Sequence, residues 1–390
     1  MCGSSAHRLF CLLIARMKIL YAHQTSPHDQ SSTASFQVFW GGPDCPARYL
    51  RDLLEERIHA VPPGGEILWV TYYFRDEGLA AALLQARCRG VRVRVVMETN
   101  PRNGDLNHRV RQLLQGDDAL GKGLRCLTHR KFDNLLLKRG RLHEKLYYFS
   151  HPAPGALVGT FNPSGNIPED PEIIRDIGDQ DRGHNVLVEI CDSTLVAGLY
   201  RHARRVFEAR HGPWESLLPQ SNRVLESGKT RIIFFPRSRW GAFNAMFDDL
   251  DSGSRLRMAV SHLNDRRICQ RLFDLARCGV FIEILAHDTQ RRVPAWVEQQ
   301  MLDSGITFNR YIHPEGLPMH NKFMLFEAAE KRTVAFGSMN LSQRSLHANH
   351  ELLVIDETPG LYDLFRRRWD EMLLEVNDFQ TRSKSQRGIS

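Results

Sequence analysis

Apolar runs and amphipathic stretches alternate along the chain in an order that occurs twice. In the N-terminal half, the apolar run Ile67–Phe74 predicts a buried strand, and the leucines of Gly78–Arg89 recur at helical spacing. A second apolar run, Val91–Met97, follows Gly90, a residue type that commonly ends a helix. A strand, a helix and a strand with a short connection indicate a parallel βαβ unit.

The C-terminal half repeats this order. Leu256–Ser261 predicts a strand, Asp265–Cys278 a helix with apolar side chains on one face, and Val280–Leu285 a second strand. The two helices even end alike, in Ala-Arg-Cys-Arg-Gly-Val and Ala-Arg-Cys-Gly-Val. Two copies of one unit predict a duplicated α/β fold, with the segment 212–229 as the linker.

Each copy then carries the same polar set. His143 and Lys145 precede one apolar strand, and His320 and Lys322 precede another. Residues i and i+2 of a strand point to one face, so each His and Lys are expected to project to one place. A turn of small residues ending in Asn follows each pair. The candidate residues in these turns are Thr160, Asn162, Ser338 and Asn340.

A third repeated element follows the turns. His184-Asn185 precedes an apolar run in the first half, and His350-Glu351 precedes one in the second. A lone His-x-Lys pair would carry little information. Two pairs inside a wider repeat indicate that the polar residues act together in one site.

These motifs resemble the phospholipase D superfamily, whose mark is His-x-Lys-x4-Asp followed by Gly-Ser-x-Asn, usually present twice. The resemblance covers most of residues 36–375 and departs at the Asp, where Ser150 and Glu327 stand. In the family that Asp usually supports the site rather than reacting. The resemblance implies a duplicated phospholipase D-like α/β/α sandwich with two pseudo-twofold related halves and one shared active site.

The implied chemistry fits the residue types. A phosphodiester is anionic, so its cleavage needs a neutral nucleophile, cations for the phosphoryl oxygens and an acid for the leaving alcohol. The resemblance implies a covalent phosphohistidine that is resolved by water or a second alcohol, with no cofactor and no metal. The two lysines would neutralise the phosphate, and the two asparagines would donate hydrogen bonds to it. Supporting roles would fall to Thr160, Ser338, Asn185, Glu327 and Glu351.

The two histidines are expected to differ in role. Because a nearby carboxylate raises the pKa of a histidine, we expect Glu351 to favour the charged form of His320. Asn185 cannot act by charge. This reasoning makes His320 the general acid and His143 the nucleophile.

Composition narrows the substrate only in part. The chain has 390 residues, of which 42% are hydrophobic and 25% charged, and this excludes a wholly disordered protein. A net charge of +7 suits an anionic partner. This charge fits a nucleic acid and an anionic lipid alike, and it is the resemblance that implies hydrolysis or transfer of phospholipid head groups at a membrane surface. The alternatives are a nuclease of the same superfamily and a non-catalytic binding module on the same fold.

The ends and the cysteines bear on organisation and location. Arg16 and Lys18 interrupt the apolar run Leu9–Leu20, so we expect no spanning segment and no secretion, and Met17 is an alternative start. Eight cysteines without a Cys-x-x-Cys pair fit a cytoplasmic protein that can lie at a membrane surface. A monomer is expected to suffice, because one chain holds both half-sites. The expected divisions are a disordered tail over 1–35, a first half over 36–211, a linker over 212–229, a second half over 230–377 and a tail over 378–390.

Several weaker signals stay open. The acidic insertion Asn166–Gly183 is either a lid or a surface loop, and the basic segment Leu124–Arg141 either steers an anion or is simply exposed. Arg366–Arg368 is expected on the polar side of a C-terminal helix over Leu361–Val376. Trp69 is expected in the core, and some of the aromatic residues after it in a pocket. His262 has no spacing that marks it as a ligand.

Overall fold

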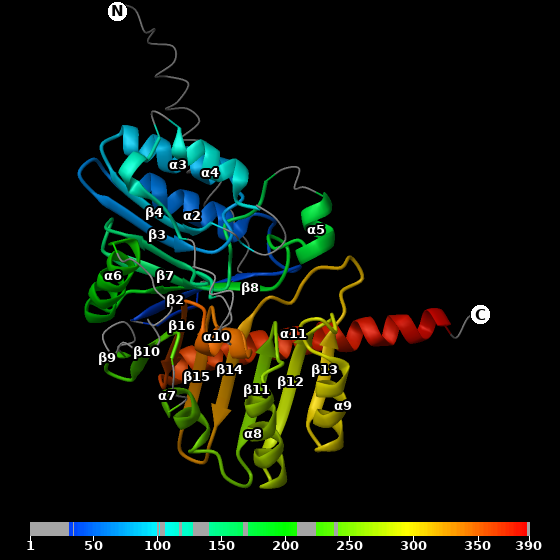
Figure 1. Cartoon of the computed structure of the whole chain (residues 1–390). Helices are drawn as coiled ribbons and strands as arrows, with labels where there is room; N and C mark the ends of the chain where they lie inside the picture. The colour runs from blue at the N-terminus through cyan, green and yellow to red at the C-terminus, as the bar shows by residue number, and fades with distance from the viewer. Residues whose placement is uncertain are drawn as a thin grey trace, which may run out of the picture.

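Two sheets of eight strands dominate the computed structural model, which describes residues 31–33, 35–99, 101, 106–116, 119–127, 140–166, 171–208, 224–237 and 241–387 (Figure 1). The first sheet has the order β5 (Leu124–Leu127), β4 (Arg92–Glu98), β3 (Glu66–Thr71), β6 (Leu146–Phe149), β7 (Gly155–Gly159), β8 (Asn185–Ile190), β2 (Phe36–Gly41) and β1 (Ser31–Thr33). The second has the order β13 (Thr307–Tyr311), β12 (Phe281–His287), β11 (Arg255–Val260), β14 (Lys322–Glu327), β15 (Arg332–Gly337), β16 (Glu351–Asp356), β10 (Thr230–Phe235) and β9 (Val224–Ser227). The orders correspond strand by strand, so the predicted duplication is confirmed.

The crossover helices explain the parallel part of each sheet. β3 pairs with β4 and β11 with β12 in parallel, and α3 (Glu77–Cys88) and α8 (Arg266–Arg277) connect them. Asp76 and Asp265 cap these helices: Asp76 accepts one hydrogen bond from a backbone N–H of the first turn, and Asp265 accepts two. Each helix is followed by a glycine with φ near 90°, Gly90 and Gly279. A glycine tolerates this left-handed conformation, so both predicted helix ends are confirmed.

The helices form three layers around the two sheets (Figure 1). α2 (Tyr49–Ala60), α3 and α4 (His108–Gln115) cover one face of the first sheet, whose core includes Trp69 as predicted. α7 (Gly241–Asn244), α8 and α9 (Ala295–Asp303) cover one face of the second. The inner faces share a core with α6 (Ser193–Glu208) and α11 (Pro359–Arg387). Because one cluster includes residues of both halves, the halves pack as one body.

The predicted divisions shift at their edges. Ser31–Thr33, which we predicted as tail, pair with β2 as β1, and Val224–Ser227, predicted as linker, pair with β10 as β9. α11 continues to Arg387 across the predicted C-terminal tail. Residues 1–30 and 212–223 lie outside the described residues. Among the described helices, none combines the length and the apolar character needed to cross a bilayer.

Candidate active site

Two matching backbone bridges cross between the halves and bring the motifs together. The backbone N–H of His143 donates to the carbonyl of His350 (2.9 Å), and that of His350 donates to Arg141 (2.8 Å). In the same way, His320 donates to the carbonyl of His184 and His184 to Pro318, both at 3.0 Å. Each His-x-Lys motif therefore lies beside the third repeated element of the other half.

The crossing between the halves places a buried carboxylate beside His143. Nδ1 of His143 lies 2.8 Å from Oε2 of Glu351, a fully buried residue. The Ser338 hydroxyl donates to the same oxygen (2.7 Å) and accepts from the backbone N–H of Leu352 (3.1 Å). Burial raises the pKa of Glu351, but His143, Lys145 and the Ser338 hydroxyl together lower it by more than burial raises it, so the net shift is downward. The carboxylate is therefore ionised at neutral pH.

His320 has the same arrangement with an amide in place of the carboxylate. Nδ1 of His320 lies 2.8 Å from Oδ1 of Asn185. The Thr160 hydroxyl donates to this oxygen (3.0 Å) and accepts from the backbone N–H of Val186 (2.9 Å). Because an amide oxygen only accepts, Nδ1 of His320 carries the proton and Nε2 is left for chemistry.

The expected partner of Glu351 was wrong. We expected Glu351 to support His320, which lies in the same half. The crossed bridges instead place Glu351 on His143 and Asn185 on His320. A repeat read along the sequence compares positions within each half and does not show this exchange.

Both lysines are buried and hold the histidine backbones. Nζ of Lys145 donates to the carbonyl of His143 and Nζ of Lys322 to that of His320, each at 2.8 Å. Burial lowers the pKa of Lys145 to about 7, against the pull of Glu351 and Glu144. Burial and the charge of Lys145 lower the pKa of Lys322 well below its usual value. The charge of Lys145 thus acts on Lys322, although the two lysines belong to different halves.

The histidines lose basicity for the same reason. Burial lowers the pKa of His143 to about 4, although Glu351 opposes this. Burial and the charges of Lys322 and Lys145 lower the pKa of His320 well below 6.5. Burial and the clustered positive charges thus disfavour protonation of both rings, and a bound anion would favour it.

The predicted asparagines and the family Asp positions lie in different places. Asn340 lines the cavity, and its buried Oδ1 has no hydrogen-bond partner among the described residues. Asn162 is buried and accepts from the backbone N–H of Tyr73 (3.5 Å). Glu327 ends β14, about 17 Å along the strand from Lys322, so the structure does not bring this side chain to the histidines. Ser150 likewise lies past the far end of β6, where its hydroxyl accepts from the backbone N–H of Glu66 (2.7 Å).

The histidines open into a cavity of about 570 Å³. No acidic and no aliphatic side chain stands among the described residues that line it. These residues are Tyr72, Tyr73, Arg141, His143, Gln180, His262, Asn264, Arg291, Arg292, His320, Asn340, Ser342, Gln343, Arg344, Ser345 and Asn349. The expectation that aromatic residues after β3 reach a pocket is therefore confirmed for Tyr72 and Tyr73.

Sequence reasoning missed His262 and Arg292. His262 follows the carboxyl end of β11, as Tyr72 and Tyr73 follow β3, and this position in parallel sheets was the available signal. Nη1 of Arg292 donates to the Ser261 hydroxyl (3.2 Å). Burial and Arg292 lower the pKa of His262 well below 6.5.

The two segments whose roles the sequence left undecided each contribute a residue to the cavity. Gln180, in the acidic insertion, forms part of the cavity wall, and its carbonyl accepts from Nδ2 of Asn185 (2.8 Å). Arg141, at the end of the basic segment, also lines the cavity and donates to the Tyr72 hydroxyl (2.7 Å). Residues 128–139 of that segment lie outside the described residues.

Arg368 departs from the predicted polar face of the C-terminal helix. It is buried, and its guanidinium contacts both carboxylate oxygens of Asp44 (2.5 and 2.8 Å) and Nδ1 of His184 (2.9 Å). Asp44, His184 and Glu375 place potential metal ligands within 4.8 Å of one another. Arg368 already supplies a cation to this cluster, which joins α11 to the His184 bridge.

Comparison with known proteins places this geometry in a family. The family model described as "Cardiolipin synthase, PLD-like domain" matches residues 63–166 and 246–373, together more than half of the chain. No curated protein matches the chain.

Two solved structures share the fold at low sequence identity. Phosphatidylserine synthase from Haemophilus influenzae has a TM-score of 0.62 and 12% identity, covering 87% of this chain and 86% of that one. Polyphosphate kinase from Porphyromonas gingivalis has a TM-score of 0.57 and 15% identity over 87% of this chain, which spans about half of that protein's length (50%). The chain belongs to the phospholipase D-like family of the cardiolipin synthase type.

Proposed function

We propose that this chain cleaves or transfers phosphodiesters through a covalent phosphohistidine and acts on phospholipid head groups. The carrying observation is the pair of histidines in one cavity. Each has Nδ1 bound to a buried oxygen and a lysine two residues on. This leaves Nε2 of both rings for reaction at one phosphorus atom.

His143 is the nucleophile in this proposal. Its pKa of about 4 keeps the ring neutral at physiological pH. When Nε2 bonds to phosphorus, the ring becomes cationic, and the ionised Glu351 at Nδ1 offsets that charge. Asn185 offers His320 no such compensation.

His320 serves as the acid and then the base. As Nε2 of His143 forms its bond to phosphorus, the P–O bond to the leaving alcohol breaks, and Nε2–H of His320 protonates that oxygen. Neutral His320 then takes a proton from water or a second alcohol, whose oxygen bonds to phosphorus as the P–N bond breaks. The negative phosphate offsets Lys322 and Lys145, the charges that lower the pKa of His320, so substrate binding favours uptake of the required proton from solvent at Nε2.

The lipid assignment draws on the matched family and on the phosphatidylserine synthase of similar fold. One observation favours a nuclease as the second candidate. The described cavity lining holds arginines and aromatic rings but no aliphatic wall for acyl chains. A lipid would therefore insert only its head group and leave its chains in the membrane, whereas a nucleic acid backbone would fill the cavity directly.

One paired assay tests the proposal. Head-group release from phosphatidylglycerol vesicles is measured beside nicking of plasmid DNA, both in EDTA. We expect lipid turnover that survives EDTA and disappears in His143→Ala, with the exposed His59→Asn on α2 as the matched control. Nicking without lipid turnover would replace the lipase with a nuclease, and no turnover of either would favour the binding module.

A further inference from the structure

His184 is bound at both ring nitrogens by side chains of α11. Nη2 of Arg368 donates to Nδ1 of His184 (2.9 Å), and Nε2 of His184 lies 3.0 Å from Oε2 of Glu375. Because a guanidinium only donates, Nδ1 carries no proton, and Nε2–H is the donor to Glu375. Burial lowers the pKa of His184, so the ring is neutral at physiological pH and this tautomer is fixed.

The same contacts join the two halves of the chain. Both carboxylate oxygens of Asp44, which follows β2 of the first half, accept from the guanidinium of Arg368 on α11 of the second half. Arg368 is buried and His184 fully so. Burial raises the pKa of Asp44, but Arg368 lowers it to about 2, so this contact is an ion pair at neutral pH.

His184 in turn holds the strand that begins at His320. The carbonyl of His184 accepts from the backbone N–H of His320 (3.0 Å), and the next residue, Asn185, binds Nδ1 of the His320 ring (2.8 Å). The ring of His143 is bound by Glu351 instead. A displacement of His184 would therefore reach His320 directly and leave the contact between His143 and Glu351 in place.

We infer that His184 and the α11 side chains bound to it position His320, so that Nε2–H of His320 meets the oxygen of the leaving alcohol. This rests on the proposed function, in which His320 is the acid, and makes the buried His184 a positioning residue. A buried polar network keeps its members in one arrangement, because each displaced group would lose a hydrogen-bond partner. A small shift of His184 should therefore slow protonation of the leaving group, whereas bond formation by His143 continues.

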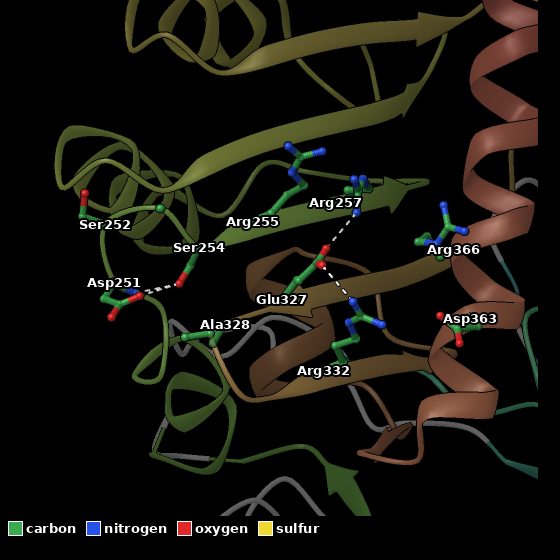
Figure 2. Close-up of a pocket in the computed structure, with 12 residues that line it drawn as sticks. Asp251, Ser252, Ser254, Arg255, Arg257, Glu327, Ala328, Arg332, Asp363 and Arg366 are labelled. Atoms are coloured by element: carbon green, nitrogen blue, oxygen red, sulfur yellow. Dashed lines mark hydrogen bonds and ion pairs between the residues drawn. The ribbon is translucent and has the colours of Figure 1, made fainter.

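A second polar cluster of α11 supplies a matched control. At the strand ends away from the histidines, Glu327 contacts Arg257 (3.4 Å) and Arg332 (3.5 Å) in the wall of a cavity of about 840 Å³ (Figure 2). The Tyr362 hydroxyl of α11 donates to Glu327 (3.3 Å). Tyr362→Phe thus removes a polar contact of α11, as His184→Leu does, but away from the active site.

Two leaving groups of different basicity test the inference. The measured rates are head-group release from phosphatidylglycerol vesicles, where the leaving glycerol needs a proton, and the first release of 4-nitrophenol from bis(4-nitrophenyl) phosphate, which needs none. We expect His184→Leu to slow the first rate at least tenfold and the second less than threefold. His184→Asn keeps an acceptor for Arg368 and should restore the first rate to within threefold of the wild type. Tyr362→Phe should leave both rates within twofold.

Gly42→Ala repeats the test without deleting a polar group. A Cβ at Gly42 would lie 2.2 Å from Nη2 of Arg368 and 2.9 Å from Nδ1 of His184, so the guanidinium must move. We expect the same selective loss, of at least fivefold, and this variant carries the test if His184→Leu does not fold. Equal slowing of both substrates, or a selective loss in Tyr362→Phe as well, would overturn the inference.

A measurement without substrate separates this inference from the proposed function. NMR of ¹⁵N-labelled histidine follows the Nδ1–H proton of His320, which exchanges slowly while Asn185 accepts it, and His320→Asn identifies the signal. We expect at least tenfold faster exchange in His184→Leu and Gly42→Ala and no change in Tyr362→Phe. This pattern in a protein that turns over neither ester would refute the proposed function and retain the positioning. Unchanged exchange in both His184→Leu and Gly42→Ala would contradict the positioning itself.

Discussion

His143 and His320 each hold Nδ1 2.8 Å from an oxygen contributed by the opposite half, but one oxygen belongs to the carboxylate of Glu351 and the other to the amide of Asn185. The hydroxyls behind them, Ser338 and Thr160, correspond as well. Duplication has preserved the hydrogen bonds and changed one charge. In the proposed mechanism the geometry is needed twice, because two rings must be held, whereas a compensating anion is needed only by the ring that is cationic in the covalent intermediate.

Removing each ring is expected to give the largest effects and to separate their roles. His143→Ala should reduce kcat by at least about 10⁴-fold on every phosphodiester, because the covalent bond has no nitrogen to form. His320→Ala should lose about 10²–10⁴-fold on an alkyl ester but far less on bis(4-nitrophenyl) phosphate, whose leaving group needs no proton. The measurement is kcat on the two substrates. Acid-quenched label found on His320 instead of His143 would reverse the assignment.

Making the half-sites alike should give a smaller loss. Glu351→Gln keeps the hydrogen bond to Nδ1 of His143 and removes the charge, so we expect kcat to fall by about 10²-fold with little change in KM. Asn185→Gln disturbs the other half-site without changing a charge and is the geometric control. If Glu351→Gln retains full kcat, compensation of the cationic ring is not what Glu351 provides.

The converse exchange should shift the pH profile. Asn185→Asp places a carboxylate at Nδ1 of His320, and a neighbouring anion raises a histidine pKa. The acid form of His320 should then persist to higher pH, moving the basic limb of kcat upward by about one pH unit with less than a tenfold change at the optimum. An unchanged basic limb would show that another group sets it.

Local repetition explains what the sequence predicted and what it did not. His-x-Lys, the small turn and Asn lie close together in each copy, so the strands that carry them and the common site followed from spacing. Contacts between segments far apart in the chain decide the rest. They set which histidine Glu351 contacts, bury Arg368 and bring Arg292 into the lining of the active-site cavity. Neither periodicity nor residue type specifies such pairings, because pseudo-twofold packing decides which half supplies each neighbour.

Acid should expose the cost of the buried His143 as a stability effect. Its folded pKa of about 4 lies below the ordinary 6.5, so the unfolded chain binds more protons between these values, and stability falls as the pH drops from about 6.5 toward 4. This single group should cost about 2 kcal/mol between pH 7 and pH 5. Urea unfolding at both pH values measures it. Between pH 7 and pH 5, the free energy of unfolding of His143→Asn should fall by less than that of the wild type. That of the exposed variant His59→Asn should fall by as much as that of the wild type.

The smallest effect is expected at Glu327, the position where the family pattern has its Asp. Glu327 holds Arg257, Arg332 and the Tyr362 hydroxyl at the end of β14, away from the reacting groups. The first half has Ser150 at the corresponding place and supplies a carboxylate from β3 instead, since Glu66 receives Arg94 (2.5 Å) and the Tyr200 hydroxyl (3.0 Å). Both carboxylates thus tie a sheet to its inner helix.

Glu327→Gln should lower the free energy of unfolding by about 1 kcal/mol and change kcat less than twofold, as measured by urea titration and hydrolysis of bis(4-nitrophenyl) phosphate. A tenfold loss of kcat with unchanged stability would show that the far end of β14 positions Lys322, and the two ends of the strand would then have to be treated as one site.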